Sequence, residues 1–316
     1  MKHADNYIFD LSDNVTRTPV HYKNRFGIKI AADLYLPKSF DKSKKYPAII
    51  VGAPYGGVKE QSPGLYANVL AQRDFAVLTF DPSYNGYSSG SPRHLSSPEI
   101  FVEDFSAAVD YLGTRDFVNR DQIGVIGICG SGGFALSAAQ VDHRIKAVAT
   151  VSMYDIARTQ RYGLHDSMTK SQRDQYLDEL GEQRYLEFLG NEPTMTPRGA
   201  AINFDENTDP ISREFGEFYS TERGYHPNSI SQFTMTSSMA FNNFSLLDHL
   251  EDISPRPILL VAGENAHSKY FSDDVYEKAK DPKELLIIPN AGHVDLYDKM
   301  DLIPFDKFEE FFKSIK

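Results

Sequence analysis

The chain has 316 residues, of which 41% are hydrophobic and 24% are charged, and its formal net charge is −11. This composition is typical of a soluble globular protein with one large domain or two ordinary ones. The negative charge argues against a nucleic-acid binder, whose affinity depends on lysine and arginine, and the single cysteine, Cys129, excludes an intramolecular disulfide and a cysteine-rich zinc site.

Seven short apolar runs predict strands. The first, residues 28–37, alternates apolar and polar residues and ends at Pro37, as a half-buried strand does. The other six are rich in valine and isoleucine without clean alternation, which is typical of strands covered on both faces. They are residues 46–54, 75–83, 123–129, 147–155, 257–264 and 284–291.

Segments with helical spacing lie between these runs, among them LYANVLAQR, IFVEDFSAAVDYLG, GGFALSAAQVD and, near the C-terminus, PFDKFEEFFKSI. Strands that alternate with helices predict an α/β fold with a doubly wound, mostly parallel sheet. Ligands of such a sheet bind at the carboxyl ends of its strands.

The alternation breaks over residues 156–250, which are polar, charged and aromatic and contain no buried-strand run. We expect this stretch to fold as a helical lid, inserted in a core formed by residues 1–155 and 251–316. A disordered linker is the weaker interpretation, because aromatic residues such as Phe188 and Phe241 require burial.

The stretch IGVIGICGSGG, residues 123–133, places a strand directly before a glycine-rich helix start. This pattern is typical of a nucleophile elbow, whose tip residue has a strained backbone and small neighbours. The strand runs straight into Cys129, which favours Cys129 over Ser131 as the nucleophile, with Gly127 and Ser131 as its small neighbours. A helix N-terminus would lower the pKa of the Cys129 thiol. The alternative is a buried, inert cysteine.

The general base is expected to be His293, which follows the last predicted strand in IIPNAGHVDLY. Hydrolases with such an elbow have the chain order nucleophile, acid, histidine, and His293 fits that order. His267 in GENAHS is the competing histidine, because it also follows the end of a strand.

Two carboxylates are candidates for the acid that orients the histidine. Glu264 ends the predicted strand 257–264, and Asp155 ends the predicted strand 147–155. We favour Glu264 over Asp155, although either could instead cap a helix or pair with an arginine. Asp295 lies close to His293 in sequence and would need an unusual turn.

The oxyanion of an acyl-transfer reaction requires two hydrogen-bond donors. One is expected from the backbone N–H of Gly130, the residue after the nucleophile. The other is expected from the loop GAPYGGVKEQ, where Pro54 has no N–H, so that Tyr55 is the candidate through its backbone or its phenol. Tyr55, Gly130 and Ser131 are therefore the residues expected around the oxyanion and the substrate.

Taken together, the elbow, the PYGG loop, the segment FDPSYNGYSSGSPR and the motifs GENAHS and GHVDLYD resemble the α/β-hydrolase superfamily. Within it, the chain is similar to dienelactone-hydrolase-like and Xaa-Pro-dipeptidyl-peptidase-like hydrolases, including a branch of polyketide transesterases and thiohydrolases. The resemblance covers nearly the whole chain and is weakest over residues 156–250. It implies a cysteine nucleophile at Cys129 and a phenol donor at Tyr55. Ser131, where glycine is usual, and the irregular acid position depart from the family pattern.

These features predict a hydrolase that cleaves an ester, thioester or lactone of a small-molecule acyl substrate through an acyl-enzyme, with no cofactor or metal. Alternatives are an acyltransferase on the same site and a catalytically silent member that binds a ligand. A phosphate- or dinucleotide-binding protein ranks last, because the glycine-rich stretch lacks the P-loop lysine. Without an apolar signal sequence or a membrane-length apolar run, we expect a cytoplasmic protein with no nucleic-acid or membrane partner. A homo-oligomer is compatible with the sequence.

Overall fold

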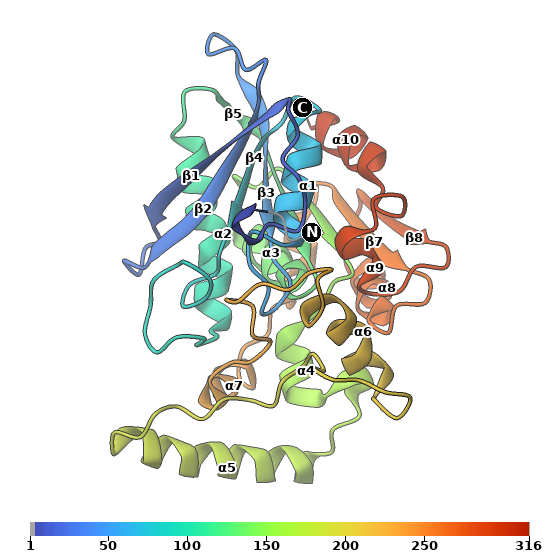
Figure 1. Cartoon of the computed structure of the whole chain (residues 1–316). Coiled ribbons are helices and arrows are strands. Elements are labelled where there is room, and N and C mark those ends of the chain that lie inside the picture. Colours follow the sequence, from blue (N-terminus) through green and yellow to red (C-terminus); the bar gives the residue numbers. More distant parts are fainter. Residues whose placement is uncertain (1–3, 316) are drawn as a thin grey trace.

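One eight-stranded sheet organises the computed structural model, which describes residues 4–315 (Figure 1). Its strand order is β1-β2-β4-β3-β5-β6-β7-β8. β1 and β2 pair antiparallel to their neighbours, and all other pairs are parallel. The strands are β1 (Val15–Lys23), β2 (Lys29–Pro37), β3 (Tyr46–Gly52), β4 (Ala76–Phe80), β5 (Val118–Ile128), β6 (Ala147–Val151), β7 (Ile258–Gly263) and β8 (Lys283–Ile288).

The seven predicted strands correspond to β2–β8, and the mostly parallel sheet confirms the expected fold class. β1 was not predicted from the sequence. This strand lies at the edge of the sheet, most of its residues are exposed or half-buried, and it contains Pro19. A proline is tolerated on an edge strand, but it hides the usual strand pattern.

Helices cover both faces of the sheet. α1 packs with α10, and α2 packs with α3, so that the four predicted helices are confirmed and form two outer layers (Figure 1). The helices are α1 (Ser62–Ala71), α2 (Pro98–Gly113), α3 (Gly130–Val141), α4 (Ile156–Tyr162), α5 (Lys170–Phe188), α6 (Pro210–Tyr219), α7 (Ser238–Phe241), α8 (Lys269–Lys278), α9 (Asp295–Asp298) and α10 (Phe305–Lys313).

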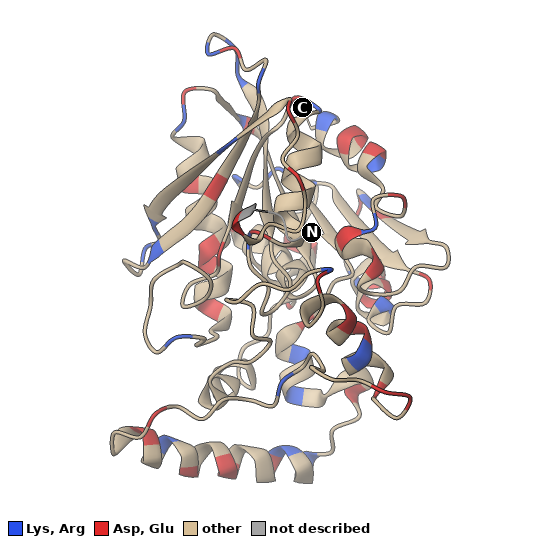
Figure 2. Cartoon of the chain, in the orientation of Figure 1, with Lys and Arg blue, Asp and Glu red and all other residues tan. Residues whose placement is uncertain are grey.

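Burial explains why the central strands show no alternation in sequence. Every residue of β4, β6 and β7 is buried, because helices cover both faces of these strands. Charged residues are concentrated outside this core, for example along α5 and α10 (Figure 2). No helix within residues 4–315 has both the length and the apolar character needed to cross a membrane.

Residues 156–250 contain the helices α4, α5, α6 and α7, which gather at one end of the sheet (Figure 1). α5 begins with a capping box in which Thr169 and Gln172 exchange side-chain and backbone hydrogen bonds. Phe241 is buried, as expected, but the expectation is wrong for Phe188, which is 91% exposed. The reason is that α5 buries only Leu180 and lies at the outer edge of this segment.

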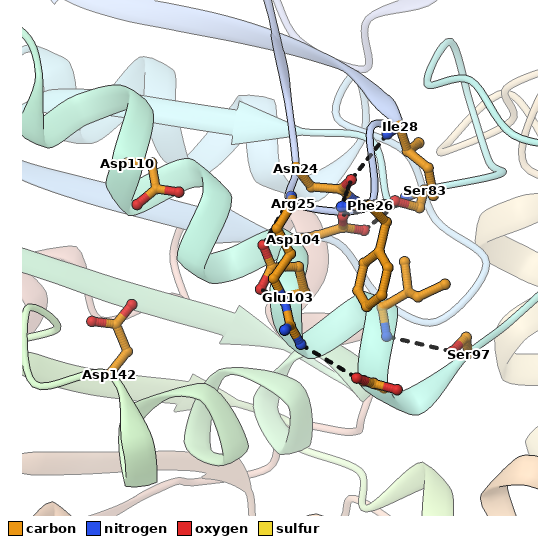
Figure 3. A network of polar contacts seen from close by, with 12 residues as sticks. Asn24, Arg25, Phe26, Ile28, Ser83, Ser97, Glu103, Asp104, Asp110 and Asp142 are labelled. Carbon is orange, nitrogen blue, oxygen red and sulfur yellow. Dashed lines mark hydrogen bonds and ion pairs between the residues drawn. The ribbon is translucent and has the colours of Figure 1, made fainter.

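A buried polar network ties the turn between β1 and β2 to α2 (Figure 3). Asn24 Oδ1 accepts hydrogen bonds from the backbone N–H groups of Phe26 and Ile28, both at 3.0 Å. Asn24 Nδ2 donates to Ser83 Oγ at 3.1 Å and to Asp104 Oδ1 at 3.0 Å. Burial outweighs these donors and raises the pKa of Asp104 to about 6.

This raised pKa predicts a pH-dependent contribution of Asp104 to stability. The folded protein binds more protons at this carboxyl than the unfolded chain between about pH 4 and pH 6, so the contribution is full below that range and is lost as the pH rises. We expect the free energy of unfolding of the wild type, minus that of Asp104→Asn, to fall by up to about 3 kcal/mol across this range. Urea unfolding at a series of pH values measures this difference.

The matched control is Asp110→Asn, which removes a solvent-exposed carboxylate from the same helix. The difference in the free energy of unfolding between the wild type and Asp110→Asn should change little with pH over the same range. A difference for Asp104→Asn that is equally flat would contradict the prediction.

Candidate active site

The nucleophile elbow is formed at Cys129, between the end of β5 at Ile128 and the start of α3 at Gly130. Cys129 has φ 53° and ψ −120°, a backbone conformation that is costly for a residue with a side chain and typical of the elbow tip. A Cβ added at Gly127 would lie 2.2 Å from the carbonyl oxygen of Ser131, so only glycine fits this tight turn. The structure thus places Cys129 at the tip.

Ser131 lies in the first turn of α3 and not at the tip. A Cβ added at Gly52 would lie 2.7 Å from its Oγ, so the side chain of Ser131 packs closely against β3. Among the described residues, Ser131 is not part of the lining of the cavity in front of Cys129. Its position is that of a small neighbour, and it differs from the substrate-binding position expected from the sequence.

The two backbone donors expected for an oxyanion both face Cys129. The N–H groups of Tyr55 and Gly130 lie near enough to the thiol sulfur to lower the pKa of Cys129. A Cβ added at Gly130 would lie 2.7 Å from the Cβ of Tyr55, which shows how closely the two loops approach. The Tyr55 phenol instead donates to Ser96 Oγ at 2.7 Å, while its ring stacks on Phe233. Tyr55 therefore presents its backbone, and not its phenol, to Cys129.

Cys129 is a thiol at rest. Burial is the largest influence and raises its pKa, and the donors that lower the pKa do not compensate, since only 5% of the residue is exposed. The lowered pKa expected from the helix N-terminus is therefore wrong. Such a thiol requires a base to become a nucleophile.

His293 follows β8 and is completely buried. Its Nε2 lies 2.9 Å from the hydroxyl of Tyr297, and its Nδ1 lies 2.6 Å from Ser268 Oγ. Its backbone carbonyl accepts a hydrogen bond from Ser152 Oγ at 2.8 Å. Burial, assisted by the neighbouring His267, lowers the pKa of His293 well below its usual value. The imidazole is therefore neutral and can accept a proton.

Tyr297 stands between the cysteine and the histidine. Its buried hydroxyl is hydrogen-bonded to His293 Nε2 at 2.9 Å and lies near enough to the Cys129 thiol to lower the pKa of that thiol. Burial raises its pKa well above the usual value, so the phenol is neutral. Tyr297 was not predicted from the sequence, although its spacing of four residues from His293 in GHVDLY places both side chains on one side of a helical turn.

Neither favoured acid lies at the histidine. Glu264 is exposed at the end of β7, where its carboxylate accepts the backbone N–H of Asn290 at 2.9 Å. Asp155 caps α4 by accepting the backbone N–H of Arg158 at 2.9 Å. Within the described part of the chain, neither carboxylate hydrogen-bonds to His293.

Asp295 does not fill the position of the acid either. It accepts the backbone N–H of Gly292 at 2.8 Å and pairs with Lys299 at 2.6 Å. The partner of His293 Nδ1 is a neutral hydroxyl, Ser268. No motif in the sequence indicated this role for Ser268.

His267, the competing base, lies beside His293 with a ring-centroid distance of 4.7 Å. Its Nε2 is 2.5 Å from the Tyr154 hydroxyl, and its Nδ1 is 3.5 Å from Glu214 Oε2. His267 therefore belongs to the same polar cluster but is joined to a different tyrosine.

A cavity of about 360 Å³ opens in front of Cys129. The core contributes Tyr55, Tyr154 and Tyr297 to its wall, and residues 156–250 contribute most of the rest, including Tyr176 and Phe215. None of its lining residues within the described chain is Asp, Glu, Lys or Arg. Within residues 4–315, no group of three or more His, Cys, Asp or Glu side chains is arranged to hold a metal ion.

Comparison with known proteins identifies relatives along the whole chain. Residues 27–188 match a family model described as X-Pro dipeptidyl-peptidase (S15 family). The chain is 50% identical over 307 residues to protein PA2218 of Pseudomonas aeruginosa. The aligned residues cover 96% of this chain and 82% of that protein. The crystal structure of PA2218 has a TM-score of 0.95 at 47% identity, covering 98% of this chain and 97% of the other.

More distant relatives have named activities. The acyltransferase drtE of Aspergillus calidoustus is 27% identical over 283 residues, covering 86% of this chain and 85% of that protein. The thiohydrolase aneE of Aspergillus aculeatus is 30% identical over 140 residues, 44% of this chain and 42% of that protein. The α/β-hydrolase GrgF from Penicillium shares the fold, with a TM-score of 0.72 at 21% identity over 95% of this chain and 99% of the other.

Proposed function

This chain belongs to the X-Pro dipeptidyl-peptidase (S15) family and is an enzyme of the α/β-hydrolase fold, and on this premise we propose that it cleaves a carboxylic ester, thioester or lactone through an acyl-enzyme on Cys129. One observation carries the proposal. The thiol at the elbow tip faces the backbone N–H groups of Tyr55 and Gly130 on one side and the Tyr297 hydroxyl, joined to His293, on the other. Nucleophile, oxyanion donors and base thus meet at one point.

In acylation, the thiol proton of Cys129 passes to the oxygen of Tyr297 while the proton of that hydroxyl passes to Nε2 of His293. The sulfur then bonds to the substrate carbonyl carbon, and the N–H groups of Tyr55 and Gly130 stabilise the negative oxygen that forms. When the carbonyl reforms, the bond to the leaving group breaks and a thioester to Cys129 remains.

In deacylation, water attacks the carbonyl carbon of the thioester and the same two N–H groups stabilise the second oxyanion. The proton that this water loses balances the one that the leaving group takes up as it departs in acylation. The bond from carbon to sulfur breaks, and the sulfur regains its proton from His293 through Tyr297. Ser268 Oγ accepts the Nδ1–H of His293 throughout, which keeps Nε2 oriented toward Tyr297.

The cavity supports an uncharged acyl group as the substrate. A dipeptide with a free N-terminus would bring an ammonium group, which is costly to bury without a carboxylate partner. The lining of the cavity within residues 4–315 has no Asp or Glu to supply that partner. Its aromatic rings and hydroxyl groups suit a neutral, partly apolar acyl chain.

Acyl transfer is the second candidate function. The cavity in front of Cys129 gives a second molecule access to the thioester. The likeness to the acyltransferase drtE also favours an alcohol or amine as the attacking group. Assays with and without an added alcohol acceptor distinguish acyl transfer from hydrolysis, because the two reactions form different products.

The experiment that tests the proposal is mass spectrometry of the intact protein, quenched during turnover of short-chain acyl p-nitrophenyl esters or acyl thioesters. We expect a mass increase equal to one acyl group, mapped by peptide analysis to Cys129, in the wild type and in Ser131→Ala. An adduct on another residue, or turnover without any adduct, would overturn the mechanism. Absence of both turnover and adduct on a broad panel of neutral esters and thioesters would support the silent, ligand-binding alternative.

A further inference from the structure

A second histidine system lies against the first. The rings of His267 and His293 are tilted by 32° with centroids 4.7 Å apart, yet their hydrogen-bond partners are separate. His293 is joined to Tyr297, whereas His267 Nε2 lies 2.5 Å from the hydroxyl of Tyr154. Each of the two histidines is thus hydrogen-bonded to a different tyrosine hydroxyl.

The carboxylate of this second system comes from residues 156–250. Glu214, on α6, places Oε2 3.5 Å from His267 Nδ1. Its Oε1 accepts the backbone N–H of Val294 at 2.8 Å, and a Cβ added at Gly292 would lie 2.8 Å from the same oxygen. Glu214 is therefore held against the turn that carries His293, and it can stabilise a positive charge on His267.

Tyr154 connects this pair to the reaction centre. Its backbone N–H donates to the carbonyl oxygen of Cys129 at 2.9 Å, and its side chain lines the same cavity as the thiol. Its ring meets the ring of His293 edge-on at 5.3 Å while its hydroxyl reaches His267. Burial is the largest influence that raises the pKa of Tyr154, and the neighbouring Cys129 adds to the shift. Tyr154 and Tyr297 therefore both present phenols at the cavity that contains Cys129.

We propose that Tyr154 is the general acid for the leaving group. His267 replaces the proton that Tyr154 donates, and Glu214 stabilises the protonated His267, so that nucleophile and leaving group use different proton paths. The inference rests on the proposed acyl-enzyme function. The path through Tyr297 ends at the buried sulfur, which must lose its proton in acylation and regain it in deacylation. A separate donor at the cavity wall allows an alkoxide or thiolate to leave protonated while His293 keeps its proton for the sulfur.

The proton balance closes over one cycle. In acylation, His293 gains the proton of Cys129, and the leaving group takes the proton of Tyr154, which is replaced from Nε2–H of a protonated His267. In deacylation, the attacking water gives its proton to Tyr154 and His267, while His293 returns its proton to the sulfur. Glu214 Oε2, 3.5 Å from His267 Nδ1, supplies the counter-charge for the proton that His267 carries in this cycle.

The test is the dependence of Tyr154→Phe on the leaving group, measured as kcat/KM for one acyl group on p-nitrophenol and on a simple alcohol. p-Nitrophenolate leaves without protonation, whereas an alkoxide requires an acid, so we expect a loss of about 100-fold or more on the alkyl ester and of less than about 3-fold on the p-nitrophenyl ester. Glu214→Gln, which keeps the size and the contact with Val294, should show the same pattern with a smaller loss on the alkyl ester. Equal losses on both esters in these variants would overturn the proposal.

A tyrosine outside the cavity serves as the control. Tyr270→Phe removes a hydroxyl of α8 that accepts the backbone N–H of His165 at 3.0 Å, and it should leave both rates unchanged. The acyl adduct on Cys129 separates this proposal from the one on which it rests. If the wild type forms the adduct and Tyr154→Phe shows no dependence on the leaving group, only the role of Tyr154 fails. If the wild type forms no adduct, the acyl-enzyme itself fails.

Discussion

Replacing Cys129 with alanine is expected to reduce kcat on a neutral ester or thioester by about 10⁴-fold or more. The residue occupies the strained tip of the elbow, and the two N–H donors and the base are arranged around its sulfur. Without the sulfur, the remaining donors can stabilise only a direct attack by water, which leaves a small residual rate. Steady-state kinetics on a p-nitrophenyl ester and on a thioester measure the loss.

The matched control is Ser131→Ala, two residues along the chain. Ser131 packs toward β3 and lies outside the cavity lining, so its loss should change kcat by less than about 3-fold, within the range of a surface or packing change. Equal losses in both variants would indicate a general packing effect at the elbow and would contradict the role assigned to Cys129. Retained activity in Cys129→Ala would contradict it directly.

Replacing Tyr297 with phenylalanine is expected to slow acylation by about 10²- to 10⁴-fold. The phenylalanine ring fills the same buried space, but the hydroxyl that joins the thiol to His293 Nε2 is lost. Rapid-quench measurement of the acyl adduct on Cys129 reports this step separately from deacylation.

The pH dependence of Tyr297→Phe distinguishes a proton relay from a structural role. Burial raises the pKa of Cys129, so a thiol without its relay must be deprotonated by solvent hydroxide. We therefore expect the acylation rate of the variant to rise with pH and to approach that of the wild type in alkaline solution. A rate that is lowered equally at every pH, or not lowered at all, would contradict the relay. Tyr35→Phe, which removes a buried hydroxyl from β2, controls for the loss of a phenol elsewhere.

Several parts of this site could be predicted from local sequence. The apolar run ending at Ile128, the glycine at position 127 and the helix start after Cys129 define a turn whose geometry depends on neighbouring residues alone. The buried strands were predicted for the same reason, since their valine and isoleucine content reflects cover on both faces. The position of His293 followed from chain order, because each strand of a parallel sheet delivers its carboxyl end to the same edge.

The partners of His293 depended on tertiary packing. Glu264 and Asp155 stand at strand ends, as the sequence indicates, but their carboxylates turn to the backbone N–H groups of Asn290 and Arg158. The direction of a side chain at a strand end depends on the nearest unpaired donor, which sequence order does not reveal. Ser268 reaches Nδ1 instead because α8 begins directly beside the turn that carries His293.

The sequence by itself thus determined the strands β2–β8 and four of the helices around them, the elbow with Cys129 at its tip and the histidine after the last strand, because these features arise from local geometry and chain order. Only the tertiary structure decided that Tyr297 stands between thiol and base, that Cys129 is protonated at rest and that Glu214 reaches His267. Each of these depends on burial and on contacts between distant segments. Both are properties of the packed protein and not of any one stretch of its chain.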